Sequence, residues 1–132
     1  MNMQKLTQKS LESIQLAQTT ATEYGNPQVE QIHLLSSLLS QEQSLTRELM
    51  QKCGVDPESL SRAVQQALSA LPRVSGGGRE ADKIYVSREL DLALNEAEKQ
   101  AEQMRDEYVS VEHLMLGLIE KPDATLKRLF AA

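Results

Sequence analysis

The sequence is poor in aromatic residues and has no excess of positive charge. It contains no Trp, one Phe and three Tyr, and its formal net charge is −5 at pH 7. Without aromatic faces for base stacking or a basic surface for phosphates, nucleic acid is not an expected partner. The core must be aliphatic, and 40% hydrophobic against 25% charged residues is the composition of a globular domain.

The sequence also lacks the features of a disulfide framework, a membrane span or a secretion signal. Cys53 is the single cysteine, so no internal disulfide can form and a reducing compartment is indicated. No apolar run approaches the roughly 18 residues of a membrane helix, and the start of the chain shows no signal-peptide pattern. These absences predict a cytoplasmic protein with no membrane partner.

One apolar stretch of the sequence occurs twice. Residues 29–39 read VEQIHLLSSLL and residues 109–119 read VSVEHLMLGLI, so His33 aligns with His113 at an offset of 80 (113 − 33 = 80). The same offset aligns Thr7 with Ser87, Ala17 with Ala97, Ala21 with Ala101, Arg47 with Lys127 and Leu49 with Leu129. A constant offset indicates an internal duplication, and two copies favour a pseudo-twofold pair over a solenoid.

Helical periodicity covers most of both copies. Apolar positions recur every three or four residues from Leu6 to Tyr24, which predicts a helix capped by Thr7 and ended by Gly25-Asn26-Pro27. Further helices are predicted over about 30–40 and 44–53, ended by Gly54, and from Asp56-Pro57 to Pro72. In the second copy, helices are predicted to start at Ser87, Ser110 and Pro122-Asp123.

The predicted fold is all-α, with two pseudo-twofold-related four-helix repeats packed as one domain over residues 1–132. Repeat one spans 1–72, a connector spans 73–85, and repeat two spans 86–132. The connector has three consecutive Gly and is predicted to be mobile. The counterpart of the fourth helix would begin near residue 136 (56 + 80 = 136), so repeat two is expected to lack its last helix and the chain to be a fragment.

No pattern in the sequence predicts catalysis, a metal site or a bound cofactor. His33 and His113 lack the spacing of metal ligands, and each is expected to hydrogen-bond locally near a helix start. Cys53 is placed at a helix C-terminus, where the dipole disfavours a thiolate. The Gly-rich connector lacks the Gly-Lys-Ser/Thr ending of a phosphate loop. The chain is therefore not expected to be an enzyme.

The remaining candidates for function are apolar side chains that could lie at the surface. The apolar face of the first helix of repeat two is predicted to contain Leu90, Ala93, Leu94, Ala97, Ala101 and Met104. Met115 is expected in the core, whereas Tyr108, near a helix junction, is equally compatible with the core and the surface. Flexible Met and amphipathic Tyr side chains suit surfaces that accept varied apolar partners.

Several motifs, in order along nearly the whole chain, resemble a known family. They are the opening Leu6-Thr7-Gln8-Lys9, the repeated His-Leu-Leu/Met, the run LPRVSGG at 71–77 and the run DEYVSVEH at 106–113. Together they resemble the N-terminal double repeat of the Clp ATPases. Within that family, the LPRVSGG run is most similar to the ClpB-type disaggregase chaperones.

The resemblance implies a recognition domain at the front of a homohexameric AAA+ ATPase, where it weakly binds unfolded or aggregated polypeptide for threading through the ring. ATP and Mg²⁺ would be bound by the rest of such a protein, and the isolated domain is expected to be a monomer. The resemblance implies substrate-handling roles for Thr7, Asp106 and Glu112. It also implies a shallow apolar groove along the first two helices of repeat two, where Leu94 falls. Met104 and Tyr108 complete the candidate substrate-binding set.

Two other functions stay open at this point. The chain is also similar to the N-domains of ClpA and ClpC, which implies docking of folded adaptors or co-chaperones in place of unfolded chains. Sharper charge complementarity and a salt-dependent association rate would mark that function. A small-molecule or enzymatic domain of the same repeat shape is the third alternative, although no polar constellation supports it.

Overall fold

The computed structural model describes residues 3–40, 45–52, 54, 56–71 and 85–131. A short 3₁₀ helix, η1 (Met3–Lys5), precedes the α-helices of repeat one. These are α1 (Gln8–Glu23), α2 (Gln31–Ser40), α3 (Leu45–Lys52) and α4 (Pro57–Ala70). Repeat two contains α5 (Arg88–Gln103), α6 (Val111–Glu120) and α7 (Ala124–Ala131). The described chain is therefore predominantly helical, as the sequence predicts.

The helix bounds reproduce the internal duplication. α5 begins and ends 80 residues after α1, and α6 begins and ends 80 residues after α2. The predicted caps are also present, because the side chains of Thr7 and Ser87 each accept a hydrogen bond from a backbone N–H three residues later. Asp56 caps α4 in the same manner through the N–H of Glu58.

Two short parallel pairings, which were not predicted from the sequence, join the repeats. Strand β1 (Gln28–Val29) pairs with strand β2 (Tyr85–Val86), with Val29 opposite Val86. An isolated bridge pairs Leu6 with Val109, which are the counterparts of Val86 and Val29 at the offset of 80. Each repeat thus pairs the segment before its first helix with the segment before the second helix of the other repeat.

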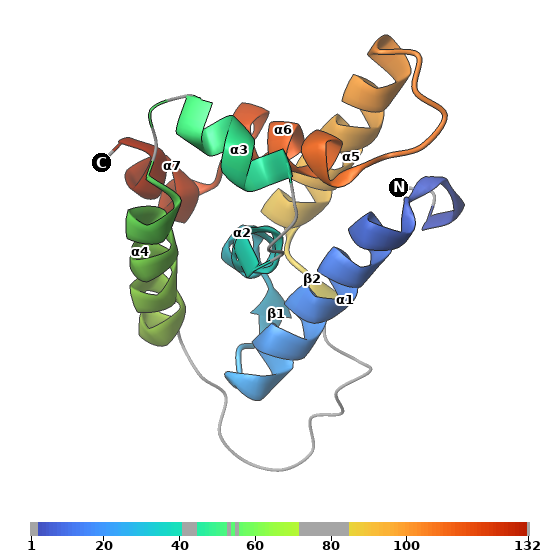
Figure 1. Ribbon diagram of the computed structural model, residues 1–132. Helices are drawn as coiled ribbons and strands as arrows, with labels where there is room; N and C mark the ends of the chain where they lie inside the picture. The colour runs from blue at the N-terminus through green and yellow to red at the C-terminus, as the bar shows by residue number, and fades with distance from the viewer. Residues whose placement is uncertain (1–2, 41–44, 53, 55, 72–84, 132) are drawn as a thin grey trace.

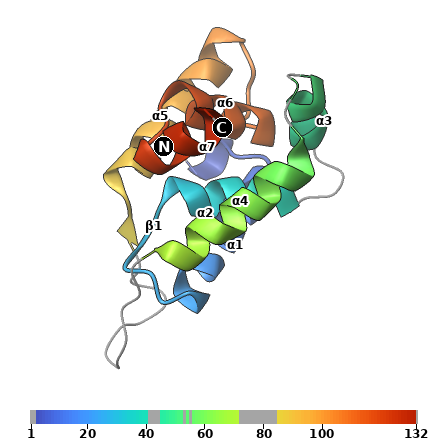
Figure 2. The ribbon, with the colours of Figure 1, turned by 90° about the vertical axis from the view of Figure 1, so that its left-hand side faces the viewer.

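Helix α2 lies at the centre of the molecule, where Figure 1 shows it end-on with the other helices around it. Leu34, Leu35 and Leu38 on α2 are at most 1% exposed. Figure 2 shows α4 running across α2, and the two helices are in contact. The core is aliphatic, as the low aromatic content predicts, and Met115 belongs to it. Burial on nearly all sides explains why α2 is the most hydrophobic helix of repeat one.

Two details differ from the sequence-based expectations, and two predictions fall outside the described residues. Met104 is 51% exposed, because it is the C-cap residue of α5 and lies beyond the buried face of that helix. Tyr85 belongs to β2 and not to the connector, while residues 73–84 of the predicted connector lie outside the described residues. Cys53 lies outside them as well.

The two repeats differ in how their second helices are covered. Leu39 on α2 and Met50 on α3 are 2% and 5% exposed, since α4 packs against both helices. Their counterparts at the offset of 80, Ile119 on α6 and Phe130 on α7, are 44% and 37% exposed. This difference agrees with the prediction that repeat two, over the residues given, lacks the helix equivalent to α4.

Candidate functional site

The segment between α5 and α6, residues 104–110, is the candidate site and is called the α5–α6 loop below. It begins with a Schellman turn, in which the N–H of Asp106 donates to the carbonyl of Ala101 at 2.9 Å and that of Arg105 to Glu102 at 3.0 Å. Arg105 has a φ of 60°, in the left-handed region, where repeat one has Gly25 at 67°. Repeat two therefore has a charged side chain at a left-handed backbone position that is occupied by glycine in repeat one.

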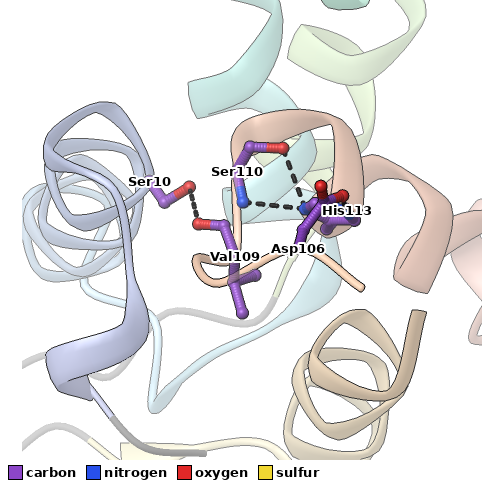
Figure 3. Close-up of polar contacts among 5 residues, drawn as sticks. All are labelled: Ser10, Asp106, Val109, Ser110 and His113. Atoms are coloured by element: carbon purple, nitrogen blue, oxygen red, sulfur yellow. Dashed lines mark hydrogen bonds and ion pairs between the residues drawn. The ribbon is translucent and has the colours of Figure 1, made fainter. Parts of the chain in front are cut away.

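His113 anchors one end of the loop to α6. Its Nδ1 accepts a hydrogen bond from the backbone N–H of Ser110 at 2.9 Å, and the Ser110 hydroxyl lies 2.9 Å from the same nitrogen. Because Nδ1 is an acceptor, the ring proton resides on Nε2, which donates to Oδ2 of Asp106 at 2.9 Å. Figure 3 shows Asp106, Ser110 and His113 gathered at the start of α6.

The N-terminal segment anchors the other end of the loop through the backbone of Val109. The carbonyl oxygen of Val109 accepts hydrogen bonds from the N–H of Thr7 at 3.1 Å and from the hydroxyl of Ser10 at 2.8 Å. The N–H of Val109 donates to the backbone carbonyl of Lys5 at 2.7 Å. Figure 3 shows the Ser10 contact, and Figure 1 shows η1 beside the chain that descends from α5. Residues 107 and 108 therefore lie between two fixed points.

Five of the six predicted site residues lie in or beside the α5–α6 loop, and the sixth is buried in the core. Met104 and Tyr108 are each 51% exposed, so the open question about Tyr108 is decided for the surface. Glu112 is half-buried in the first turn of α6. The Thr7 hydroxyl caps α1 and bonds to the hydroxyl of Ser10 at 2.9 Å. Leu94, at 9% exposed, belongs to the core.

Three residues that shape the site were not among those predicted from the sequence. They are Arg105, Val109 and Ser10, which set the turn, the pairing and the N-terminal contact. The repeat offset could have pointed to Arg105, because it aligns Arg105 with Gly25 at the end of the preceding helix. The contact between Ser10 and Val109 joins residues 99 positions apart, and no local pattern reports such a contact.

Repeat one contains the same histidine junction in a more buried form. Nδ1 of His33 accepts from the N–H of Glu30 at 2.8 Å, and Nε2 lies 2.8 Å from Oδ1 of Asn26. Both His33 and Asn26 are 0% exposed. Burial lowers the pKa of His33 from 6.5 to about 4. The prediction that both histidines hydrogen-bond locally near helix starts is confirmed.

The low pKa of His33 predicts a loss of stability in mild acid. Between pH 6.5 and 4 the unfolded chain binds a proton at this ring that the folded chain does not bind, so the free energy of unfolding falls as the pH falls. The expected contribution is up to about 3 kcal/mol over that window. Urea unfolding at pH 7 and pH 4 measures it.

The matched control is His33→Gln, which has no group that titrates in that window. It should be less stable than the wild type at pH 7 and show a smaller decrease between pH 7 and pH 4. Taking the difference between the two proteins removes the contributions of other groups, such as Glu30, whose pKa is raised by burial and by the nearby Asp123 and Glu89. Equal decreases in the two proteins would refute the assignment to His33.

The described part of the chain shows no arrangement typical of metal chemistry or membrane insertion. Among residues 3–40, 45–52, 54, 56–71 and 85–131, no group of three or more His, Cys, Asp or Glu side chains could hold a metal ion. No helix in those ranges is long and apolar enough to cross a bilayer. What the candidate site offers is a surface, with two exposed apolar side chains on a loop that is fixed at both ends.

Comparison with known proteins connects this geometry to a family. Residues 5–132 match the model described as the Clp repeat N-terminal domain. The chaperone protein ClpB of Nitratidesulfovibrio vulgaris is 38% identical over 126 residues, which cover 96% of this chain but 15% of ClpB. The chain thus spans about a seventh of the length of that relative.

Solved structures show the same fold. The crystal structure of the Hsp104 N-terminal domain from Candida albicans aligns with a TM-score of 0.84 at 23% identity and covers 96% of this chain and 80% of that domain. A ClpV N-domain in complex with a VipB peptide aligns with a TM-score of 0.74 at 21% identity, over 98% of this chain and 79% of that one. The chain belongs to the Clp repeat N-terminal domain family.

Proposed function

We propose that this chain is the non-catalytic substrate-recognition domain of a ClpB-type, ATP-dependent disaggregase. It weakly binds unfolded or aggregated polypeptide at the α5–α6 loop and delivers it to the AAA+ ring of the longer protein. The similarity to ClpB over 96% of the chain supports the type of protein. ATP and Mg²⁺ are bound elsewhere in that protein, which acts as a homohexamer in the cytoplasm.

The observation that carries the proposal is the joint exposure of Met104 and Tyr108 on one anchored loop. Both side chains are 51% exposed, and the loop is held by Asp106 at one end and Val109 at the other. Thioether and phenol side chains supply apolar contact without demanding one partner geometry. A loop with fixed ends loses little entropy when it binds, so even a small apolar surface can produce measurable affinity.

Weak binding suits a domain that must release its substrate to a translocating ring. Two exposed side chains bury too little area for a stable complex, which normally removes roughly 1,200–2,000 Å² from water. Six copies around a ring restore avidity, because a bound chain keeps the neighbouring copies at high effective concentration. Charges of both signs accompany the apolar side chains, because Arg105 and Glu107 are exposed on the same loop and Glu112 is half-buried in the first turn of α6.

The second candidate is the docking of an adaptor or co-chaperone. The ClpV N-domain that shares this fold is in complex with a VipB peptide, so the fold is compatible with recognition of a defined peptide segment. An adaptor would use the charges around the loop, and its association rate would fall steeply with added salt. Binding through Met104 and Tyr108 to varied unfolded chains would depend on salt much less.

The test is a titration of the ¹⁵N-labelled chain with reduced, carboxymethylated α-lactalbumin and, separately, with the same protein folded and disulfide-bonded. Amide shifts are expected in residues 104–112 with the unfolded form alone. Tyr108→Ala should weaken binding about fivefold to tenfold, as truncation of an aromatic anchor does. Tyr85→Ala is the matched control, because Tyr85 is 75% exposed at the opposite end of α5.

The outcomes separate the two candidates. Shifts at the α5–α6 loop that appear only with the unfolded form and weaken in Tyr108→Ala support substrate capture. A well-dispersed spectrum with no shifts from either form contradicts direct recognition and favours adaptor docking. Equal weakening by Tyr85→Ala would show that contact is spread over the surface and is not a property of this loop.

A further inference from the structure

The two repeats use different acceptors for the same histidine contact. In repeat one, Nε2 of His33 lies 2.8 Å from the amide oxygen of Asn26. In repeat two, Nε2 of His113 lies 2.9 Å from a carboxylate oxygen of Asp106. Asn26 and Asp106 are related by the offset of 80, and each follows a left-handed residue at the end of a long helix. Asn26 and Asp106 thus occupy equivalent positions and each contacts Nε2 of the histidine in its own repeat.

The contact with Nε2 of the histidine needs a hydrogen-bond acceptor but does not need a negative charge. Nδ1 of His113 accepts from the N–H of Ser110, as Nδ1 of His33 accepts from the N–H of Glu30, so each ring has its proton on Nε2. An amide oxygen or a carboxylate oxygen can each accept that proton. Repeat one shows that the junction closes with the neutral acceptor, because His33 and Asn26 form it while fully buried.

The Asp106 contact fixes the part of the loop that leads to Tyr108. Beyond Asp106, the next anchor is Val109, whose carbonyl accepts from Thr7 and Ser10. Glu107 and Tyr108 are the residues between these anchors, and both are exposed. Without the bond to His113, the Asp106 end of the loop would be held only by the backbone hydrogen bonds of the Schellman turn, and the Tyr108 side chain would sample more orientations.

We infer that Asp106 is a positioning residue, which acts through Nε2 of His113 to hold Tyr108 in place, and that its charge is not what recognises the polypeptide. This inference rests on the proposed function and deepens it. Recognition of substrate by the carboxylate itself would require the charge. Positioning requires only the acceptor, so an amide at residue 106 should serve as well.

The experiment compares Asp106→Asn with Asp106→Ala in the isolated chain. Binding of reduced, carboxymethylated α-lactalbumin is measured at low and at high salt. Hydrogen exchange of the amides of residues 105–109 is measured without ligand. Asp106→Asn retains the acceptor and removes the charge, while Asp106→Ala removes both. Asn26→Ala is the matched control, because it breaks the equivalent bond in repeat one, outside the proposed site.

Asp106→Asn is expected to bind within about twofold of the wild type and to keep the protection of the loop amides. Asp106→Ala should bind about tenfold more weakly and should exchange the amides of residues 105, 106 and 109 faster, because these amides donate the backbone hydrogen bonds at the two ends of the loop. Asn26→Ala should leave binding unchanged although it lowers stability. Equal weakening in Asn26→Ala would show that the Asp106→Ala effect is general destabilisation, which overturns the inference.

The inference and the proposed function can fail separately. If the wild type binds and Asp106→Asn binds as weakly as Asp106→Ala, the charge itself is used and the inference is wrong. If the wild type does not bind the unfolded protein, the proposed function is wrong, and hydrogen exchange still decides whether Asp106 holds the loop. Unchanged exchange of the hydrogen-bonded amides of residues 105, 106 and 109 in Asp106→Ala would overturn the positioning role directly.

Discussion

Replacing Gln31 by methionine is expected to lower the free energy of unfolding by about 3 kcal/mol. Gln31 is 0% exposed, and its side-chain amide bonds to three backbone groups of repeat two. Nε2 donates to the carbonyls of Glu89 at 2.8 Å and Lys121 at 2.7 Å, and Oε1 accepts from the N–H of Asp123 at 2.8 Å. Methionine matches the shape of glutamine but leaves all three groups without this partner.

The effect should be large because the three groups lie at three different helix ends. Glu89 is in the first turn of α5, Lys121 ends α6, and Asp123 precedes α7, where its carboxylate caps the helix through the N–H of Leu126. A buried donor or acceptor that loses its partner costs about 1–3 kcal/mol, and no other side chain of this length supplies two donors and one acceptor. Each helix of repeat two thus has one end tied to α2 through this residue.

Chemical denaturation followed by circular dichroism measures the change. Gln66→Met is the matched control, because Gln66 is exposed on α4 and the same substitution there should change stability by less than about 0.5 kcal/mol. A second variant, Gln31→Glu, should be at least as destabilised at pH 7, since a carboxylate would face two carbonyl oxygens. Equal stabilities of the Gln31→Met and Gln66→Met variants would contradict the role assigned to Gln31.

The sequence predicted those parts of the fold that depend on local signals. A hydroxyl before an apolar-periodic run placed the caps at Thr7 and Ser87, and Asp56-Pro57 placed the start of α4. The end of α1 at Glu23 followed from the Gly25-Asn26-Pro27 stop. Such signals work because caps and turns are satisfied by residues within one helical turn of each other.

The contacts between the repeats could not be predicted in this way. The pairing of β1 with β2 involves two residues on each side and that of Leu6 with Val109 only one, which is too short for an alternating strand pattern. No local sequence pattern distinguishes Gln31 either, because its hydrogen-bond partners lie 58 to 92 positions away. The repeat offset aligns it with Val111, a position that packs without hydrogen bonds from its side chain.

The candidate site was predicted as a region better than as a set of side chains. Apolar periodicity does not show where the buried part of a helix ends. Leu94, in the middle of α5, and Met104, its C-cap residue, were therefore predicted to lie on the same apolar face. The structure buries Leu94 in the core and exposes Met104, because Met104 caps the end of α5 that extends beyond α6 (Figure 1). Asp106 was predicted from the family resemblance, and its contact with His113, like that of Asn26 with His33, is visible only in the structure.

Replacing Gly117 by alanine is expected to destabilise the fold by about 2 kcal/mol, although alanine is the better helix former by about 1 kcal/mol. Gly117 is in the middle of α6, where that helix crosses α5. An added methyl carbon would overlap the carbonyl oxygen of Ala93 and lie 3.1 Å from the backbone nitrogen of Ala97. Backbone atoms cannot rotate away as a side chain can, so the two helices would have to separate.

Ser37 is the counterpart of Gly117 in repeat one and provides the control. Its hydroxyl donates to the carbonyl of Ser13 on α1 at 2.6 Å, so α1 and α2 are spaced for a side chain at this crossing. Ser37→Ala should therefore cost only about 1 kcal/mol, the net contribution of one hydrogen bond. Separation of α5 from α6 in Gly117→Ala would also pull His113 from Asp106, and faster exchange of the amides of residues 105–109 should accompany the loss of stability. If Gly117→Ala is as stable as the wild type and exchange in the loop is unchanged, α5 and α6 can accommodate a methyl group at residue 117, and the predicted steric overlap with Ala93 is wrong.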